Sequence, residues 1–333
     1  MKGRVNLVAC GALIGALAVA QTSTYKYVRM GSDQDAATRA VAGYALMGGG
    51  SDLDEAFDFL CKKSAYGDFL IVRAAGGDDY NSYVNQLCHV NSVATLIIPS
   101  RAAANDARVA EIILKAEAVF IAGGDQARYI NWWQGTLVQG ALNEHIAAGK
   151  PIGGTSDGLA VLGDYIYSAQ GDAPDDASLT SAQALANPYA PRVTVRRDFL
   201  KLRLLHNTLT DTHFAKRDRM GRTLVFLARI VQDRWSSDPR AIAVDEKSAV
   251  LVEADGKARV IGPGSGAYFI QVTEKPSVCR ADTPLSFRGF VVYRAPRGST
   301  FDLEAWKGAG GRTYQLSAEA GSISSSQEGG PTY

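Results

Sequence analysis

The chain has 333 residues, of which 46% are apolar and 21% are charged. This composition is typical of a globular protein and excludes a disordered or collagen-like chain. The 35 Lys and Arg residues balance 34 Asp and Glu residues, so net charge gives no indication of a nucleic-acid or anionic membrane partner.

The first twenty residues have the pattern of a secretory signal peptide. Lys2 and Arg4 precede an apolar run that ends in the small-x-small triplet Ala18-Val19-Ala20. The run is short for a membrane span and no charged stop-transfer segment follows it. We therefore expect a signal peptide over residues 1–20, a secreted or extracytoplasmic mature protein and no membrane span. A second interpretation is a lipoprotein box at Leu7–Cys10, although the apolar stretch continues past the cysteine.

Three cysteines remain after such a signal: Cys61, Cys88 and Cys279. Disulfides persist in oxidising compartments, and the loop between the first two is of modest length. We therefore expect a Cys61–Cys88 bridge. The alternative is three buried free thiols, because cysteine is common in protein cores.

The region before residue 150 alternates apolar strands with helices. Helical spacing follows Ser51, covers 103–116 and extends from about 126 to 148. Apolar strands that alternate with helices predict a mostly parallel sheet covered by helices on both faces, an α/β fold. Ligands of such sheets bind at the carboxyl ends of the strands. The expected strands, three of which end in glycines, are 41–47, 69–72, 93–98 and 118–122.

The pattern changes after about residue 240. Residues 241–246 and 249–252 are typical of a hairpin, and further short strands follow. From Lys307 onward Gly and Ser dominate, so we expect that tail to be poorly ordered. The expected organisation is an α/β domain over 21–245, a C-terminal β-rich extension packed on it over 246–306, and a Gly/Ser-rich tail over 307–333.

Residues Gly154-Thr155-Ser156-Asp157-Gly158 match G-x-S-x-G between a predicted strand and a predicted helix. This spacing produces a sharp turn that raises the serine hydroxyl above the sheet edge. The helix N-terminus behind it favours developing negative charge. We therefore predict that Ser156 is a nucleophile.

A serine nucleophile requires a base, and two histidines follow it in the chain. His213 lies at a strand end among polar residues, so we favour it over His206. The third member of a triad is a carboxylate that orients the base. We expect Asp172, just beyond a short strand at 165–169, and the other candidates are Asp175, Asp176 and Gln170.

A cluster of arginines follows the predicted base. Arg219 and Arg222 share one face of the first turn of a predicted helix, where cations oppose the helix dipole. Arginine binds carboxylates as a bidentate fork, so the cluster, together with Arg217, is suited to an acidic substrate. The alternative is a set of surface arginines paired with Asp211 and Asp218.

Three blocks of the sequence together resemble the cyanophycinase-like serine peptidases of family S51. They are residues 120–126, 153–158 and 211–222. The resemblance implies a flavodoxin-like sheet and a Ser–His–acid triad that uses no metal or cofactor. It implies Ser156 as nucleophile and His213 as base. The implied oxyanion positions are Gly124 and the Asp157 N–H, and the implied substrate-binding residues are Gln126, Arg217, Arg219 and Arg222.

The resemblance also implies a substrate class. Members of the family cleave after acidic residues, either in α-Asp dipeptides or in β-Asp-Arg units of cyanophycin. We therefore expect an acidic or aspartyl peptide as substrate, no nucleic-acid partner, and a homodimer as a candidate assembly. The sequence departs from the family at Asp157, where Ala is usual, and at Thr212, where cyanophycin-degrading members have Gln.

The departure at Asp157 motivates an alternative function, a catalytically silent S51-like protein that binds acidic peptides. A third hypothesis is an esterase of the α/β-hydrolase fold. That fold places its histidine near the chain end, whereas here no histidine follows His213 and more than a hundred residues remain.

Overall fold

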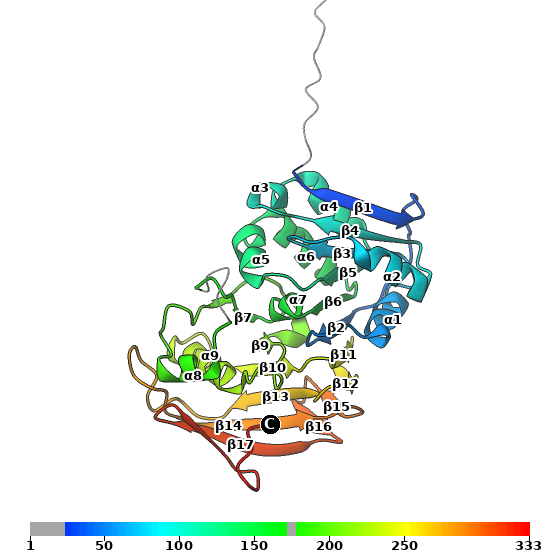
Figure 1. Cartoon of the computed structure of the whole chain (residues 1–333). Coiled ribbons are helices and arrows are strands. Elements are labelled where there is room, and N and C mark those ends of the chain that lie inside the picture. The colour runs from blue at the N-terminus through cyan, green and yellow to red at the C-terminus, as the bar shows by residue number, and fades with distance from the viewer. Residues whose placement is uncertain (1–23, 172–177) are drawn as a thin grey trace, which may run out of the picture.

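The computed structural model describes residues 24–171 and 178–333. The chain forms two β-sheets; the first runs from the upper end of the molecule in Figure 1 to its lower part, where its last strands lie beside the second sheet. Strands β4, β3, β5, β6 and β2 of the first sheet are parallel, and antiparallel strands extend it at both edges. In spatial order this ten-stranded sheet contains β1 (Lys26–Gly31), β4 (Ser92–Ile97), β3 (Asp68–Arg73), β5 (Ala118–Ile121), β6 (Ile152–Thr155), β2 (Gly43–Met47), β11 (Ala249–Glu253), β12 (Lys257–Ile261), β15 (Thr300–Asp302) and β16 (Lys307–Ala309).

The second sheet is mostly antiparallel, but β9 pairs in parallel with β10 on one side and with β7 on the other. In spatial order its eight strands are β18 (Ser322–Ser325), β17 (Arg312–Glu319), β14 (Phe287–Ala295), β13 (Ala267–Val272), β10 (Arg240–Val244), β9 (Thr208–Asp211), β7 (Tyr165–Tyr167) and β8 (Val195–Arg197).

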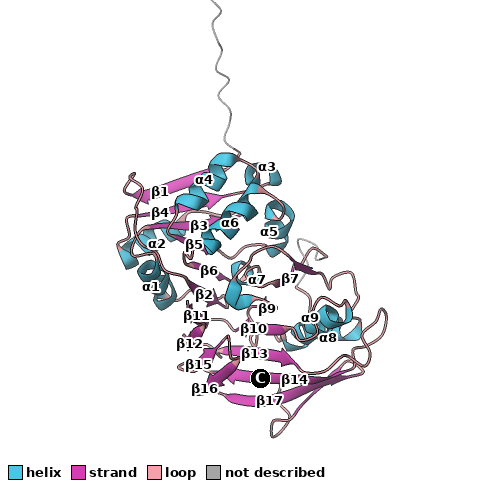
Figure 2. Cartoon of the chain, turned by 180° about the vertical axis from the view of Figure 1, so that it is seen from behind, coloured by secondary structure: helices cyan, strands magenta, loops and turns pink. Residues whose placement is uncertain are grey.

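Helices cover both faces of the first sheet, as Figures 1 and 2 show. On β3, Phe69 and Ile71 pack into the core beneath α1 and α2, while Leu70 and Val72 pack on the opposite side beneath α4 to α6. Alternate side chains of a strand point to opposite faces, so a strand buried on both faces is apolar throughout. This confirms the predicted fold class. The helices are α1 (Asp54–Lys63), α2 (Asp79–Cys88), α3 (Arg101–Ala104), α4 (Ala107–Lys115), α5 (Gln126–Trp133), α6 (Leu137–Ala147) and α7 (Asp157–Ala160).

A separate core lies on the second sheet, beneath α8 (Ser181–Ala186) and α9 (Met220–Gln232); a 3-10 turn, η1 (Arg203–Leu205), precedes β9. The expectation of a poorly ordered tail was wrong, because residues 307–325 form β16 to β18. Tyr314, Leu316 and Ala318 alternate along β17 and are buried in this core. Period-two burial of a few apolar residues is enough to fix a strand even in a Gly- and Ser-rich segment.

The expected boundary at residue 245 does not fall between the two sheets. Strands β9 and β10 belong to the second sheet, whereas β11 and β12 return to the first and β11 pairs with β2. The segment after residue 245 therefore contributes strands to both sheets. It is not simply an extension packed on the surface of the α/β domain.

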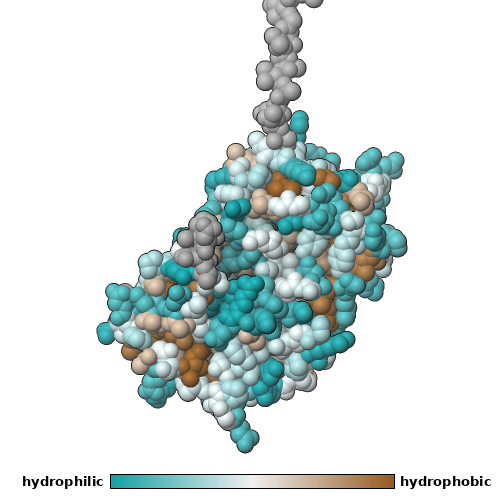
Figure 3. Space-filling model, viewed as in Figure 1, coloured by the Kyte–Doolittle hydropathy of each residue, from teal (hydrophilic) through white to brown (hydrophobic). Residues whose placement is uncertain are grey.

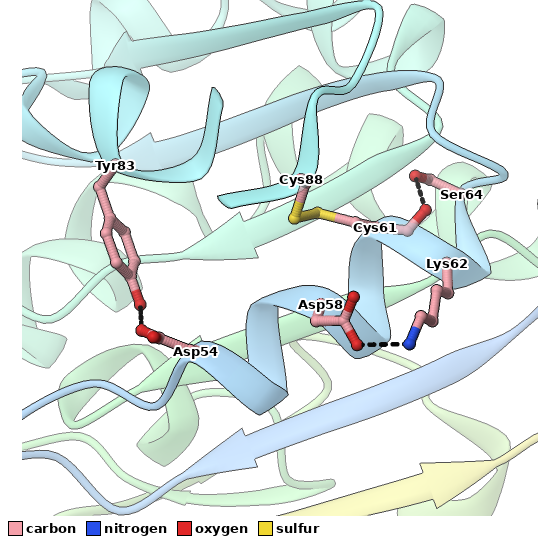
Figure 4. The surroundings of a disulfide bond; sticks show 7 residues. All are labelled: Asp54, Asp58, Cys61, Lys62, Ser64, Tyr83 and Cys88. Carbon is pink, nitrogen blue, oxygen red and sulfur yellow. Dashed lines mark hydrogen bonds and ion pairs between the residues drawn. A yellow bond between two sulfur atoms is a disulfide. The ribbon is translucent and has the colours of Figure 1, made fainter. Parts of the chain in front are cut away.

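A disulfide joins Cys61 near the end of α1 to Cys88 at the end of α2 (Figure 4). The predicted pairing is confirmed, and the S–S distance is 2.14 Å. Cys279 is a buried free thiol. Closing a loop of 27 residues contributes about 3.5 kcal/mol of stability in the chain-entropy model. The bridge therefore fixes the two helices that cover one face of the parallel strands.

The predicted signal peptide, residues 1–20, lies outside the described residues. Within the described ranges, no helix combines the length and the apolarity that crossing a bilayer requires. The face shown in Figure 3 is mostly hydrophilic, with small hydrophobic patches separated from one another.

Candidate active site

Ser156 lies on a sharp turn between β6 and α7. These two elements lie near the middle of the molecule in Figures 1 and 2. Its backbone has φ 52° and ψ −121°, a sparsely populated conformation that costs roughly 1–3 kcal/mol. The flanking glycines permit this turn. A Cβ on Gly154 would lie 2.6 Å from the carbonyl group of Gly158, and a Cβ on Gly158 would lie 2.0 Å from the carbonyl oxygen of Ile121. The G-x-S-x-G spacing therefore forms the predicted strand–turn–helix elbow.

His213 approaches this elbow from the second sheet, two residues beyond the end of β9. Its Nε2 lies 2.7 Å from Ser156 Oγ, across a separation of 57 residues in the chain. The His213 N–H donates to the Gly48 carbonyl oxygen at 2.8 Å. A Cβ on Gly49, whose φ is +96°, would lie 2.5 Å from the His213 ring. The glycines after β2 thus allow the imidazole to pack against the backbone.

The carboxylate beside His213 is Glu246, which the sequence analysis did not identify. Its Oε1 lies 2.6 Å from His213 Nδ1. Glu246 lies two residues beyond the end of β10, as His213 lies two residues beyond the end of β9, and these strands are parallel neighbours with Ala243 opposite Asp211. Glu246 could have been predicted from its position two residues after a strand end, which matches the position of His213. The expectation of a hairpin over 241–252 concealed this match, because β10 pairs with β9 and β13 instead.

The predicted acid, Asp172, and two of its alternatives, Asp175 and Asp176, lie outside the described residues. Gln170, the remaining alternative, has other hydrogen-bond partners. Its amide N–H donates to Asn131 Oδ1, and its Oε1 accepts from Arg196 Nε at 2.7 Å. Among the described residues the partner of His213 Nδ1 is therefore Glu246.

The three side chains form a chain of hydrogen bonds suited to proton transfer. Burial lowers the pKa of His213 below its ordinary 6.5, an effect that the hydrogen bond to Glu246 opposes. Burial disfavours ionisation of Glu246 too, but the hydrogen bond with His213 and the charge of Arg217, whose Nε lies 3.4 Å away, hold the pKa of that carboxyl below its ordinary value. Near neutral pH the site therefore pairs an unprotonated imidazole with an ionised carboxylate.

The two expected oxyanion positions are the residue after Ser156 and the residue after Gly123; a Cβ on Gly123 would lie 3.4 Å from Ser156 Cβ. One of them is occupied by a side chain of the protein itself. The Gly124 N–H donates to Asp157 Oδ2 at 3.2 Å. The Asp157 N–H belongs to the first turn of α7, where helical N–H groups have no intrahelical partner. Burial raises the pKa of Asp157 above its ordinary 3.8, although the Gly124 N–H and the charge of Arg219 counteract it. The role of Gly124 in binding an oxyanion stays a prediction.

The expected substrate-binding residues differ in their burial and in their hydrogen-bond partners. Gln126 is buried, and its side-chain amide donates to the Tyr167 carbonyl oxygen. Arg219 is buried as well, with bonds of 3.0 Å to both oxygens of Thr212. Burial and the neighbouring Arg222 charge lower the pKa of Arg219 to about 10, so it is cationic at neutral pH. Arg217 is half exposed, which leaves it as the accessible cation of the group.

Arg222 holds Asp211 and does not face an open site, a correction to its expected role. Its Nε lies 3.0 Å from Asp211 Oδ2, its Nη2 contacts the other oxygen, and each side chain is 2% exposed. Burial disfavours the charge of Asp211, but the Arg222 and Arg219 charges and the bond from Thr223 hold its pKa below the ordinary value. The pair therefore anchors α9 to the end of β9, next to His213.

Replacing Asp211 by Ala should lower the free energy of unfolding by about 3–5 kcal/mol at pH 7, because it leaves the buried Arg222 charge without a partner. The measurement is urea unfolding followed by fluorescence. Asp58→Ala, which removes an exposed ion pair with Lys62, is the control and should change stability little. An Asp211→Ala variant as stable as this control would show that the buried pair contributes nothing.

Among the residues that the structure describes, no group of three or more His, Cys, Asp or Glu side chains is arranged to hold a metal ion. The described site therefore consists of a hydroxyl, an imidazole, a carboxylate and backbone N–H groups. This set is suited to acyl transfer through a serine.

Comparison with known proteins identifies relatives that share this region. Cyanophycinase from Synechococcus elongatus is 28% identical over 179 residues, which are 53% of this chain and 48% of that protein. Cyanophycinase from Trichormus variabilis is 26% identical over 218 residues, 63% of this chain and 65% of that protein. The chain thus spans about half to two thirds of the curated relatives that it matches. A solved peptidase from an acI-B1 actinobacterium is 16% identical, with a TM-score of 0.47 over 70% of this chain and 95% of that one.

The sequence profile described as Peptidase family S51 matches residues 52–260. That range begins just before α1, ends in β12 and contains Ser156, His213 and Glu246. It therefore covers the parallel strands of the first sheet from β3 onward and both strands that position the base and the acid. The chain is a cyanophycinase-like member of peptidase family S51.

Proposed function

We propose that this protein is a serine peptidase that hydrolyses peptide bonds at aspartyl residues, in α-Asp peptides or β-Asp-Arg units, and that it acts outside the cytoplasm. The observation that carries the proposal is the continuous relay from Ser156 Oγ to His213 Nε2 and from His213 Nδ1 to Glu246 Oε1. Membership of a peptidase family supports the reaction class.

The geometry supports a two-step acyl transfer. His213 Nε2 takes the proton of Ser156 as Oγ attacks the scissile carbonyl carbon, and Glu246 stabilises the imidazolium through Nδ1–H. The same Nε2–H then protonates the departing amine, so the C–N bond breaks and an acyl-serine remains. Water, deprotonated by His213, resolves the ester. In this proposal the Asp157 and Gly124 N–H groups bind the oxyanion of each tetrahedral intermediate.

The charges around the site support an anionic substrate group. Arg217 is half exposed and contacts Glu246, so a substrate carboxylate bound to Arg217 would lie near the triad. Arg219 adds a second, buried positive charge. The relatives named cyanophycinase indicate β-Asp-Arg units as the first substrates to test.

Two features support export of the protein. The first twenty residues have the signal-peptide pattern, and the Cys61–Cys88 disulfide is typical of proteins that fold in an oxidising compartment.

The proposal is tested with the purified chain, residues 21–333, incubated separately with β-Asp-Arg dipeptide polymer and with a series of Asp-X dipeptides. We expect release of free amino groups from at least one of the two substrate classes, and none from matched Asn-X dipeptides, because Asn lacks the carboxylate that pairs with arginine. Equal turnover of Asp-X and Asn-X would contradict the aspartyl preference.

The second candidate function is a catalytically silent relative that binds acidic peptides. It is favoured by one observation, the Asp157 carboxylate on the Gly124 N–H. Saturable binding of Asp-X dipeptides by calorimetry, with no turnover at any pH from 4 to 9, would support this function over the first.

A further inference from the structure

The departure from the family at the residue after the nucleophile has a specific place in the site. Asp157 Oδ2 accepts the N–H of Gly124 at 3.2 Å. A Cβ on the preceding residue, Gly123, would lie 3.9 Å from Ser156 Oγ, so the loop that carries this N–H lies next to the nucleophile. The carboxylate therefore occupies a backbone donor that could otherwise bind the oxyanion of the reaction. The small Ala usual at this position could not reach the N–H in this way.

Other charged groups face the Asp157 carboxylate from the elements packed around it. Helix α5 contributes Asp125 at its N-cap and Tyr129 in its second turn. The turn after β9 contributes Arg217 and Arg219, and their positive charges favour the ionised form. His213 contacts the neighbouring Ser156 through Nε2.

These groups do not all act in the same direction. Burial and the negative charge of Asp125 disfavour ionisation of Asp157 and raise its pKa above 3.8. The Tyr129 hydroxyl donates its proton to the Ala122 carbonyl oxygen at 2.8 Å and not to the Asp157 carboxylate. The carboxylate can therefore take up a proton under milder conditions than an exposed aspartate.

We propose that Asp157 is a proton-controlled gate on the oxyanion site of Ser156. Ionised, it accepts the Gly124 N–H and places a negative charge where the oxyanion must form. Protonated, it releases this N–H and presents a hydroxyl that donates to the oxyanion, as a neutral carboxylic acid can do in an apolar site. This inference rests on the proposed function, because it concerns the regulation of the same nucleophile.

The gate predicts a particular pH dependence. Activity rises with pH as His213 loses its proton. The midpoint of this rise lies below pH 6.5, the ordinary pKa of histidine, because burial lowers the pKa of His213. Activity then falls with further increase in pH as Asp157 ionises, at a pH above 3.8 because its pKa is raised. The wild-type profile is a bell displaced to the acidic side, and its two limbs are macroscopic properties of the coupled groups.

The experiment measures the rate at which a fluorophosphonate probe labels Ser156 between pH 4 and 9. Labelling forms the Oγ–P bond, breaks the P–F bond and passes the serine proton to His213, while the phosphoryl oxygen takes the oxyanion position. This readout needs no knowledge of the natural substrate. The variants are Asp157→Ala and Asp157→Asn, with Asp198→Asn as control; Asp198 is exposed and has φ +65°, which Asn tolerates.

We expect both Asp157 variants to lose the alkaline decline and to reach a plateau. Removal of one oxyanion donor costs on the order of 10²-fold in rate, so at pH 8 Asp157→Ala should label at least tenfold faster than wild type. At the acidic end the ratio of Asp157→Ala to wild type should fall to one or below, because protonated Asp157 adds a donor that Ala lacks. Asp198→Asn should follow wild type throughout. Thermal unfolding confirms that each variant is folded.

The outcomes separate the gate from the proposed function. Equal labelling of wild type and Asp157→Ala at every pH would overturn the gate and leave Ser156 as a nucleophile. An alkaline decline retained in both Asp157 variants would assign that limb to another group and would also overturn the gate. A folded Asp157→Ala variant that never labels would contradict the nucleophile itself, and the gate with it.

Discussion

Replacement of Ser156 by Ala should abolish hydrolysis, with a fall in kcat of about 10⁴-fold or more, because no other hydroxyl lies within reach of His213 Nε2 among the described residues. The variant retains the Cβ atom and removes only Oγ, so the fold should persist. The measurement combines turnover of the best aspartyl substrate with calorimetric binding of the same compound, which should be retained.

The control for this variant is Ser82→Ala, which removes an exposed hydroxyl from α2. It should leave kcat and KM unchanged. Turnover by Ser156→Ala at more than one hundredth of the wild-type rate would show that the hydrolysis does not proceed through an acyl-serine.

Replacement of Glu246 by Gln should lower kcat by about 10²- to 10⁴-fold, because the amide no longer enforces Nδ1–H on His213 and no longer stabilises the imidazolium. Loss of the carboxylate also removes an interaction that raises the pKa of His213. The acidic limb of kcat/KM should therefore move to still lower pH, a shift that simple loosening of the structure would not produce.

Two further variants make this result specific. Glu246→Asp keeps the charge and should recover part of the activity. Glu253→Gln removes a carboxylate that pairs with Lys63 away from the site and should match wild type. If Glu246→Gln retains full activity with an unmoved acidic limb, another acid orients His213, and the predicted Asp172 becomes the residue to replace next.

Much of the parallel sheet could be predicted from local patterns. Uninterrupted apolar runs such as 69–72 indicate strands buried on both faces, and the structure places these residues alternately in two cores. Ser156 was found for the same reason, since its conformation depends on the glycines beside it in the chain. His213 was found because so few histidines exist.

Glu246 was not among the predicted acids because its position beside His213 depends on pairing between distant segments. Residues 241–252 have the short apolar repeats of a hairpin, but β10 pairs in parallel with β9, and β11 crosses to pair with β2. Local periodicity does not determine which strand becomes the neighbour. Similarly, the roles of Arg222 and Gln126 were decided by burial, which residue type and spacing alone do not reveal.

The groups of the proposed triad come from both sheets: the hydroxyl follows β6 of the first, whereas the imidazole and the carboxylate follow β9 and β10 of the second. A chain that has folded only its N-terminal half therefore carries an ordinary alcohol with no base beside it. Under the proposed function, hydrolytic competence is therefore acquired only after β9 and β10 bring His213 and Glu246 to Ser156.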